Sequence, residues 1–298
     1  MRLCWSDSFG GPLRNMSVEE AKVFYAMGFR VVGINSGDAD ATDADIDRAR
    51  KILDDTGLMP GPYGGGRATF HPDPSVCSQY KKELARVLKI AGKLGCPTVR
   101  VSGGTMHPTN PWLHHPENHT QKALDLFVEN TRELVPVAED SRCTITPETT
   151  QWTIINSVER MKEFVDRLDS PYVKIILDPV NHMTYDRVYD SGSFIQCAIA
   201  TLGDRIGDIH VKDVMVQDKQ LVSHIDEAKM GTGVLDHEAL IEASSQLAPW
   251  KTFSLEHISD RGFIKEAHDY IQGVADRIGH TWSDPACTRE RYEKGMYK

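Results

Sequence analysis

Short β-branched segments alternate with amphipathic helical segments along nearly the whole 298-residue chain. Eight segments resemble buried strands: Arg2–Ser6, Val31–Asn35, Leu58–Tyr63, Thr98–Ser102, Thr144–Thr149, Val173–Asp178, Asp208–Asp213 and Thr252–Glu256. Helical periodicity marks Ser17–Met27, Asp43–Thr56, Val76–Leu94, Glu117–Glu139, Asn156–Leu168, Ser193–Leu202, Asp236–Leu247 and Gly262–Ile278. Strands that alternate with helices form parallel sheets. Eight such units favour an α/β fold with a single closed (β/α)8 TIM barrel over an open doubly wound sheet, and no GxGxxG motif follows the first strand.

The barrel is expected to span residues 1–280 as the catalytic domain, with residues 281–298 as a polar C-terminal tail. Two long segments rich in Gly and Pro, Gly61–Asp73 and Gly103–His119, each follow a predicted strand and resemble lids over a barrel mouth. Pro136 is expected to kink or end the helical stretch that contains it, because proline lacks the backbone N–H that a helix interior needs.

The charge balance restricts the classes of partner. A net charge of -9 and a pI of about 5.7 make general nucleic-acid binding unfavourable, since phosphate contacts need a basic surface. No apolar run approaches the roughly 20 residues of a membrane span. The six cysteines are scattered without CxxC spacing, which is typical of reduced thiols in a cytoplasmic protein. We therefore expect a cytoplasmic enzyme with a small-molecule substrate. Barrels of this kind commonly pair through their outer helices, so we also expect a homo-oligomer.

The last four predicted strands end in acidic or metal-binding residues, within TITPE, VKIILD, DIHVKD and TFSLE. Parallel strands of a barrel bring these ends to one mouth, so Glu148, Asp178, His210 and Glu256 should converge there. Three carboxylates in one place repel each other unless a cation lies among them. Their hard, oxygen-rich set favours one Mn²⁺ ion, with Mg²⁺ or Co²⁺ as alternatives, over structural Zn²⁺.

The same motifs carry a family resemblance over roughly residues 2–278. DPVN after one strand, IHVKD in the next and a Glu that closes the eighth resemble the sugar isomerase/epimerase superfamily of xylose-isomerase-like barrels, which includes ketose 3-epimerases and inosose-processing enzymes. The resemblance implies that Glu148, Asp178, His210 and Glu256 bind the metal and that the two glutamates act as catalytic acid and base. Asn181 departs from the pattern, because ketose epimerases carry a His there.

Such a site can move a proton beside a carbonyl through a metal-stabilised enediolate, with one glutamate removing the proton and the other returning it. The predicted function is therefore a sugar or sugar phosphate isomerase or epimerase. A lyase of the same scaffold that eliminates a substituent from a 3-keto sugar or glycoside is the main alternative. A related metal hydrolase, the three-zinc DNA-repair endonuclease, and a non-catalytic barrel are more remote alternatives.

Several further residues are candidates for substrate binding: Asn181, His182, Lys212, His224 and His107. Lys212 should point to the same side of its strand as His210, while His182 equally fits a buried core histidine. Arg100 on the fourth strand is expected to pair with an acidic ligand or to form a core salt bridge. Lys229–Gly233 fits either a phosphate-binding turn or, as we favour, a plain loop. Three tryptophans near strand ends or lids, Trp5, Trp112 and Trp152, have the chemistry to stack on sugar rings.

Overall fold

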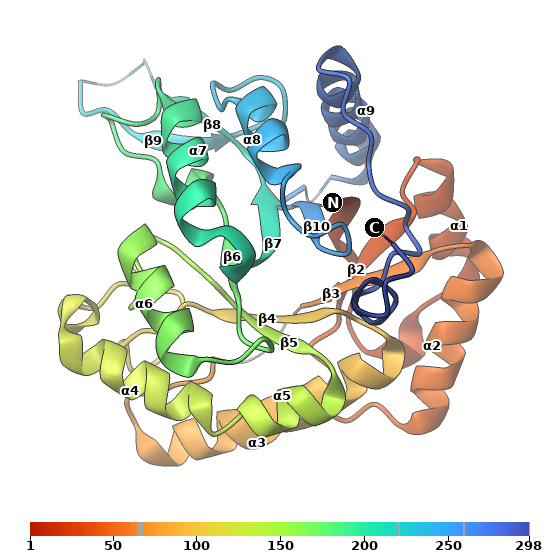
Figure 1. The fold of residues 1–298 in the computed structure, drawn as a ribbon, viewed down its shortest axis with the longest axis horizontal. Coiled ribbons are helices and arrows are strands. Elements are labelled where there is room, and N and C mark those ends of the chain that lie inside the picture. Colours follow the sequence, from red (N-terminus) through yellow and green to blue (C-terminus); the bar gives the residue numbers. More distant parts are fainter. Residues whose placement is uncertain (65–67, 218, 220, 259, 298) are drawn as a thin grey trace.

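The computed structural model describes residues 1–64, 68–217, 219, 221–258 and 260–297. Eight parallel strands form a closed barrel in the order β1-β10-β7-β6-β5-β4-β3-β2. The ring closes where β1 pairs with β10, with Arg2 beside Thr252 and Trp5 beside Leu255. The helices lie outside the strands (Figure 1). The predicted (β/α)8 barrel is confirmed, and the open sheet is excluded.

The barrel strands are β1 (Arg2–Gly10), β2 (Val31–Asn35), β3 (Met59–Tyr63), β4 (Thr98–Ser102), β5 (Thr144–Glu148), β6 (Ile175–Leu177), β7 (Ile206–Val211) and β10 (Thr252–Leu255). The helices are α1 (Val18–Ala26), α2 (Asp43–Thr56), α3 (Pro74–Leu94), α4 (Gln121–Arg132), α5 (Val135–Ser141), α6 (Val158–Leu168), α7 (Ser191–Leu202), α8 (His237–Ser244), α9 (Arg261–Arg277) and α10 (Arg289–Glu293). Short 3-10 turns are η1 (Leu13–Asn15), η2 (Pro116–His119), η3 (Val180–His182) and η4 (Gly203–Arg205).

Local chemistry explains where the helices begin and end. Thr42 caps α2 in a capping box with Asp45, and Gly57 ends the same helix in the left-handed conformation that glycine adopts without strain. The helical stretch predicted over Glu117–Glu139 is divided, because α4 ends at Arg132 and α5 begins at Val135. Pro136 lies in the first turn of α5, where its missing N–H costs no hydrogen bond.

The amino-terminal end of the barrel is closed by buried cations. Lys174 and Lys251 each donate to the carboxylate of Asp204 at 2.8 Å, and Arg2 donates to the carbonyl of Trp250. The tail beyond residue 280 packs against this end of the same chain, where Arg289 donates to Thr144 Oγ1 at 2.8 Å. These contacts stabilise the fold and leave the carboxyl ends of the strands open for a functional site.

The segment after the seventh strand contains a hairpin, where the sequence predicts the end of that strand followed by a loop. The strand expected over Asp208–Asp213 ends at Val211, and Asp213 begins β8 (Asp213–Val216), which pairs antiparallel with β9 (Ile225–Ala228). Figure 1 shows this hairpin projecting beyond α7 at the edge of the barrel. Within the described ranges, no helix combines the length and the apolar character needed to cross a bilayer.

Candidate metal centre

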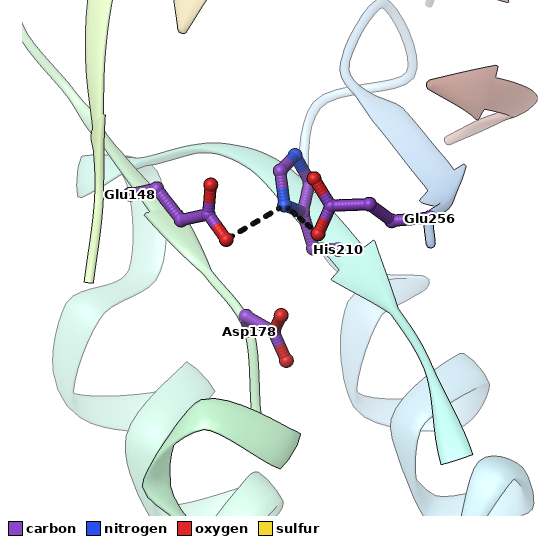
Figure 2. Close-up of side chains that lie close together, drawn as sticks. All are labelled: Glu148, Asp178, His210 and Glu256. Atoms are coloured by element: carbon purple, nitrogen blue, oxygen red, sulfur yellow. Dashed lines mark ion pairs between the residues drawn. The ribbon is translucent and has the colours of Figure 1, made fainter. Parts of the chain in front are cut away.

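The four predicted ligands lie at the carboxyl ends of neighbouring strands. Glu148 is the last residue of β5, Asp178 follows β6 directly, His210 lies next to the end of β7, and Glu256 follows β10. Because these strands are parallel neighbours, their ends meet at one mouth. Figure 2 shows the four side chains turned toward one another from four separate elements.

Their potential ligand atoms all lie within 4.8 Å of one another, and all four residues are buried. The Nδ1 atom of His210 lies 2.8 Å from Glu256 Oε2 and 3.5 Å from Glu148 Oε1. Asn181 supports this arrangement, because its side-chain amide donates to Glu148 Oε1 at 3.2 Å. The structure therefore brings together all four residues that the sequence selected.

Several of these buried atoms accept or donate no hydrogen bond of good geometry: Asp178 Oδ2, Glu256 Oε2 and both ring nitrogens of His210. Buried polar atoms normally have such partners, and a cluster of buried atoms that make ion pairs without good hydrogen bonds fits a site for a cation. Three carboxylates and one imidazole are the donor set of a divalent cation such as Mn²⁺ or Mg²⁺. The residues present thus fit one divalent ion.

Two positive side chains border the same carboxylates. Lys212 Nζ lies 3.0 Å from Asp178 Oδ2 and 3.3 Å from Glu256 Oε2, and Arg100 forms an ion pair with Glu256. The sequence predicts that Lys212 points to the same side of its strand as His210 and binds substrate. In the structure its ammonium group points toward the four metal-capable residues Glu148, Asp178, His210 and Glu256, which we call the quartet. Lys212 therefore offers partial charge compensation to the carboxylates that would bind a cation.

The electrostatics of the quartet follow from this burial and pairing. Burial alone would raise the pKa of Glu256, but the charges of His210, Arg100 and Lys212 hold that pKa well below its ordinary range. Burial lowers the pKa of His210, yet Glu256 and Glu148 together raise it well above the ordinary value. For Asp178, burial is the larger effect and raises the pKa despite the opposing charge of Lys212. A divalent ion would bind to His210 in its neutral form, because a metal-binding ring nitrogen must give up its proton.

The quartet opens into a cavity with a volume of about 1240 Å³. Glu148 and Glu256 line its inner end together with Asn181, Lys212 and Arg100. Trp112 and Trp152, from the segments after β4 and β5, line the same cavity. Polar and charged groups at one end and aromatic groups elsewhere match the general anatomy of small-molecule sites.

Sequence reasoning missed two residues at the mouth, Glu227 on β9 and His257 after Glu256. Glu227 Oε1 lies 3.2 Å from Lys212 Nζ and 2.9 Å from His257 Nδ1. His257 has a φ of 57°, which is uncommon outside glycine and often marks functional sites. Its backbone N–H donates to the carboxylate of Asp7. In the sequence, the available signal for Glu227 was the acidic pair that it forms with Asp226.

Three predicted substrate ligands do not line this cavity. His182 is buried, with Nε2 bonded to Thr149 Oγ1, and burial lowers its pKa to about 4. His107 Nδ1 accepts from the backbone N–H groups of Thr109 and Asn110, so it caps its own loop. His224 lies beside Asp226 on the opposite face of the hairpin from Glu227. Residues of a strand alternate between faces, which separates His224 from Glu227. His182 is thus a buried structural residue, His107 caps its loop, and His224 lies on the outer face of the hairpin.

The turn Lys229–Gly233 is already filled by a side chain of the same chain. The carboxylate of Asp213 accepts from the backbone N–H groups of Gly231, Gly233 and Leu235 at 2.9–3.2 Å. A Cβ at Gly233 would lie 2.2 Å from this carboxylate, so the close approach requires glycine. The backbone donors of this turn therefore bind Asp213 and not a phosphate, which agrees with the plain-loop interpretation.

Comparisons with known proteins agree with this fold. The family model described as "Xylose isomerase-like TIM barrel" matches residues 21–277. A D-psicose 3-epimerase of Enterocloster bolteae is 26% identical over 197 residues, which is 62% of this chain and 62% of that protein. A putative L-ribulose-5-phosphate 3-epimerase, SgbU, of Escherichia coli K12 is 21% identical over 184 residues, 62% of this chain and 59% of that protein. The chain thus spans about three fifths of the length of these curated relatives.

Solved structures show the same architecture. A D-psicose 3-epimerase crystallised in the presence of D-fructose matches with a TM-score of 0.71 at 16% identity, over 94% of this chain and all of that one. A xylose isomerase-like TIM barrel protein of Mycobacterium smegmatis in complex with magnesium matches with a TM-score of 0.67 at 16% identity, over 91% and 96% of the two chains. With the family model covering most of its length, this chain belongs to the xylose isomerase-like TIM barrel family.

Proposed function

We propose that this protein is a divalent-metal-dependent sugar epimerase or isomerase in which Glu148 and Glu256 act as the acid and base pair. The observation that carries the proposal is the convergence of the two glutamates on His210, with Asp178 beside them, at the inner end of a cavity. Metal-complexed and epimerase relatives of the same fold support it.

When bound, a divalent ion polarises a substrate carbonyl and its neighbouring hydroxyl, which acidifies the C–H bond between them. Glu148 and Glu256 come from β5 and β10, with β6 and β7 between them in the barrel. They are therefore set to face a bound sugar from two sides. One carboxylate takes the proton while the electrons of the C–H bond move to the carbonyl oxygen. The other carboxyl group returns a proton to the same carbon or to its neighbour, which gives an epimer or an isomer.

The electrostatic setting favours one starting state for Glu256 and one orientation for Glu148. Arg100, His210 and Lys212 hold Glu256 as a carboxylate, which is the form that a general base needs. Asn181 donates to Glu148 and so fixes the direction of that carboxyl group. Arg100 and Lys212 also offer donors along the path from the cavity to the glutamates.

The alternatives named from the sequence receive less support. The curated relatives carry the names of epimerases, which favours proton transfer over the elimination of a lyase. A three-zinc nuclease needs further clusters of ligands. Across the described portion of the chain, the metal-capable side chains gather in the single group formed by Glu148, Asp178, His210 and Glu256.

The test is solvent isotope exchange in the metal-loaded protein. We expect about one Mn²⁺ ion per chain by metal analysis, and deuterium from D₂O incorporated beside the carbonyl of a ketose in a panel of free and phosphorylated sugars. Product analysis by NMR then separates epimers from aldose–ketose isomers. A stoichiometric metal ion with no exchange in any sugar of the panel would contradict the proposed proton transfer.

A further inference from the structure

The cavity is larger than a single sugar ring requires. Its volume of about 1240 Å³ exceeds the roughly 300–1,000 Å³ of pockets that bury drug-sized ligands. It runs from Glu148 and Glu256 to a wall that contains Pro111, Trp112 and Trp152. A ligand that filled it would therefore contact both the proton-transfer groups and this aromatic wall.

Hydrogen bonds hold the ring of Trp152 and the backbone of Trp112 before any ligand binds. Trp152 Nε1 donates to the carbonyl of Trp112 at 2.8 Å, which ties the segment after β4 to the segment after β5. Asn118 is fully buried and donates to the carbonyl of Trp152 at 2.6 Å, and its own Oδ1 accepts from Met106 N–H. These bonds remove most of the ordering cost that a mobile aromatic wall would impose on binding.

Both rings nevertheless keep a large exposed surface. Trp112 is 39% exposed and Trp152 is 42% exposed, in a protein that buries Trp5 and Trp250 almost completely. Exposed indoles that line a cavity are suited to the apolar C–H faces of a sugar ring. The wall therefore has the chemistry of a subsite for a second ring.

The charges of the cavity favour an uncharged ligand. Four carboxylates line it, those of Asp7, Glu148, Glu227 and Glu256. Among the described residues that line it, Arg100 pairs with Glu256, Lys212 with Glu227 and Glu256, and His257 with Glu227. A divalent ion at the metal centre would neutralise Glu148 and Glu256, but Asp7 and Glu227 lie outside that centre and would still repel a phosphate dianion in the cavity.

We infer that the substrate is an uncharged saccharide of at least two sugar units, whose reacting ring lies at Glu148 and Glu256 and whose second ring stacks on Trp112 and Trp152. The inference rests on the proposed function and adds the substrate class. It separates this protein from enzymes that act on sugar phosphates.

Four ketoses that share a fructose unit test it. D-fructose carries no substituent, D-fructose 6-phosphate carries a phosphate on O6, and isomaltulose and maltulose carry a glucosyl unit on O6 and O4. Calorimetric titration of the Mn²⁺-loaded protein measures the four dissociation constants, and solvent deuterium exchange is followed in the same samples. We expect at least one disaccharide to bind about tenfold more tightly than D-fructose, which corresponds to about 1.4 kcal/mol and lies within the range of one stacking contact. D-fructose 6-phosphate should bind more weakly than D-fructose.

Trp112→Ala and Trp152→Ala should each remove most of that tenfold preference and change the affinity for D-fructose less than about twofold. Trp152→Phe keeps an aromatic face but loses the donor to Trp112, so it should retain more of the preference than Trp152→Ala and less than the wild-type protein. Tyr189→Ala removes an aromatic ring that is 75% exposed outside this cavity, and it serves as the matched control.

Three outcomes would overturn the inference and leave the proposed proton transfer intact. D-fructose 6-phosphate could bind most tightly of the four, or D-fructose and both disaccharides could bind equally. The third outcome is a preference that the tryptophan variants leave unchanged. Failure of all four ketoses to bind or exchange would instead count against the proposed function and, with it, this substrate class.

Discussion

The Nζ atom of Lys212 lies 3.0 Å from Asp178 Oδ2, inside the group of side chains that fits a divalent cation. The pairing raises the pKa of Lys212 far above its ordinary value, although burial opposes it. An ammonium group in this position partly neutralises the carboxylates and also repels an incoming metal ion. Lys212 is thus both a partner of the quartet and a competitor of its cation.

Replacing Lys212 should separate these two roles. Lys212→Met keeps the length of the side chain and removes its charge, so we expect the dissociation constant for Mn²⁺ to fall about tenfold because a nearby like charge is lost. Turnover should fall because a donor at the mouth is lost. Calorimetric metal titration and kinetic assays measure the two effects. Weaker metal binding in this variant would show that Lys212 assists the ion, contrary to our expectation.

Metal binding should stabilise the folded protein. Three buried carboxylates repel one another in the absence of an ion, and an ion that binds only the folded state at 100 times its dissociation constant adds about 2.7 kcal/mol. We expect treatment with a chelator to lower Tm by roughly 5 °C and Mn²⁺ to restore it, as measured by differential scanning calorimetry. Asp178→Asn should lose this metal-dependent shift. A Tm that changes with neither the chelator nor Mn²⁺ would argue against the metal centre.

Neutralising either glutamate should stop proton transfer. Glu148→Gln and Glu256→Gln keep the size of the side chains and remove their ability to exchange protons, and we expect deuterium exchange to slow at least about 100-fold in each. Glu227→Gln is a suitable comparison, because Glu227 lies at the mouth of the same cavity but outside the quartet. It should retain the bulk of the exchange rate. Normal exchange in Glu148→Gln would remove that residue from the acid and base pair.

His182 should make stability depend on pH in the acid range. Burial, with a smaller effect from Arg187, lowers its pKa from 6.5 to about 4 in the folded protein. Between these values the unfolded chain binds a proton that the folded chain does not, so the free energy of unfolding falls as pH falls from 6.5 to 4. The contribution is roughly 1.4 kcal/mol per pH unit inside that window and is constant above it.

His182→Gln should reduce this acid-range slope, because glutamine has no proton to gain. Urea denaturation at pH 5 and pH 7 measures the difference for both proteins, and the variant is expected to lose less stability between the two values. His107→Gln is the control, since His107 lies in a partly exposed loop. Equal slopes in the wild-type protein and His182→Gln would show that His182 is not held neutral.

The strand pattern by itself determined the barrel and the position of the quartet. A strand of a parallel barrel is buried on both faces, which produces the apolar run Ile175–Leu177 before Asp178. Neighbouring parallel strands end at the same edge of the barrel. Polar residues at successive strand ends are therefore neighbours in space, independent of the conformation of the loops between the strands. Pro136 likewise marked the division between α4 and α5, because its backbone chemistry acts locally.

Only the tertiary structure decided which other side chains reach the site. The hairpin of β8 and β9 turns Glu227 toward Lys212 and leaves His224 on the other face, and this depends on a register set by pairing between separate segments. Asp213 fills the turn at Gly231 and Gly233, 18 and 20 residues away in the chain. The hydrogen bond from Trp152 to Trp112 joins loops 40 residues apart. Local sequence patterns carry no information on such contacts, because each depends on where the barrel places distant segments.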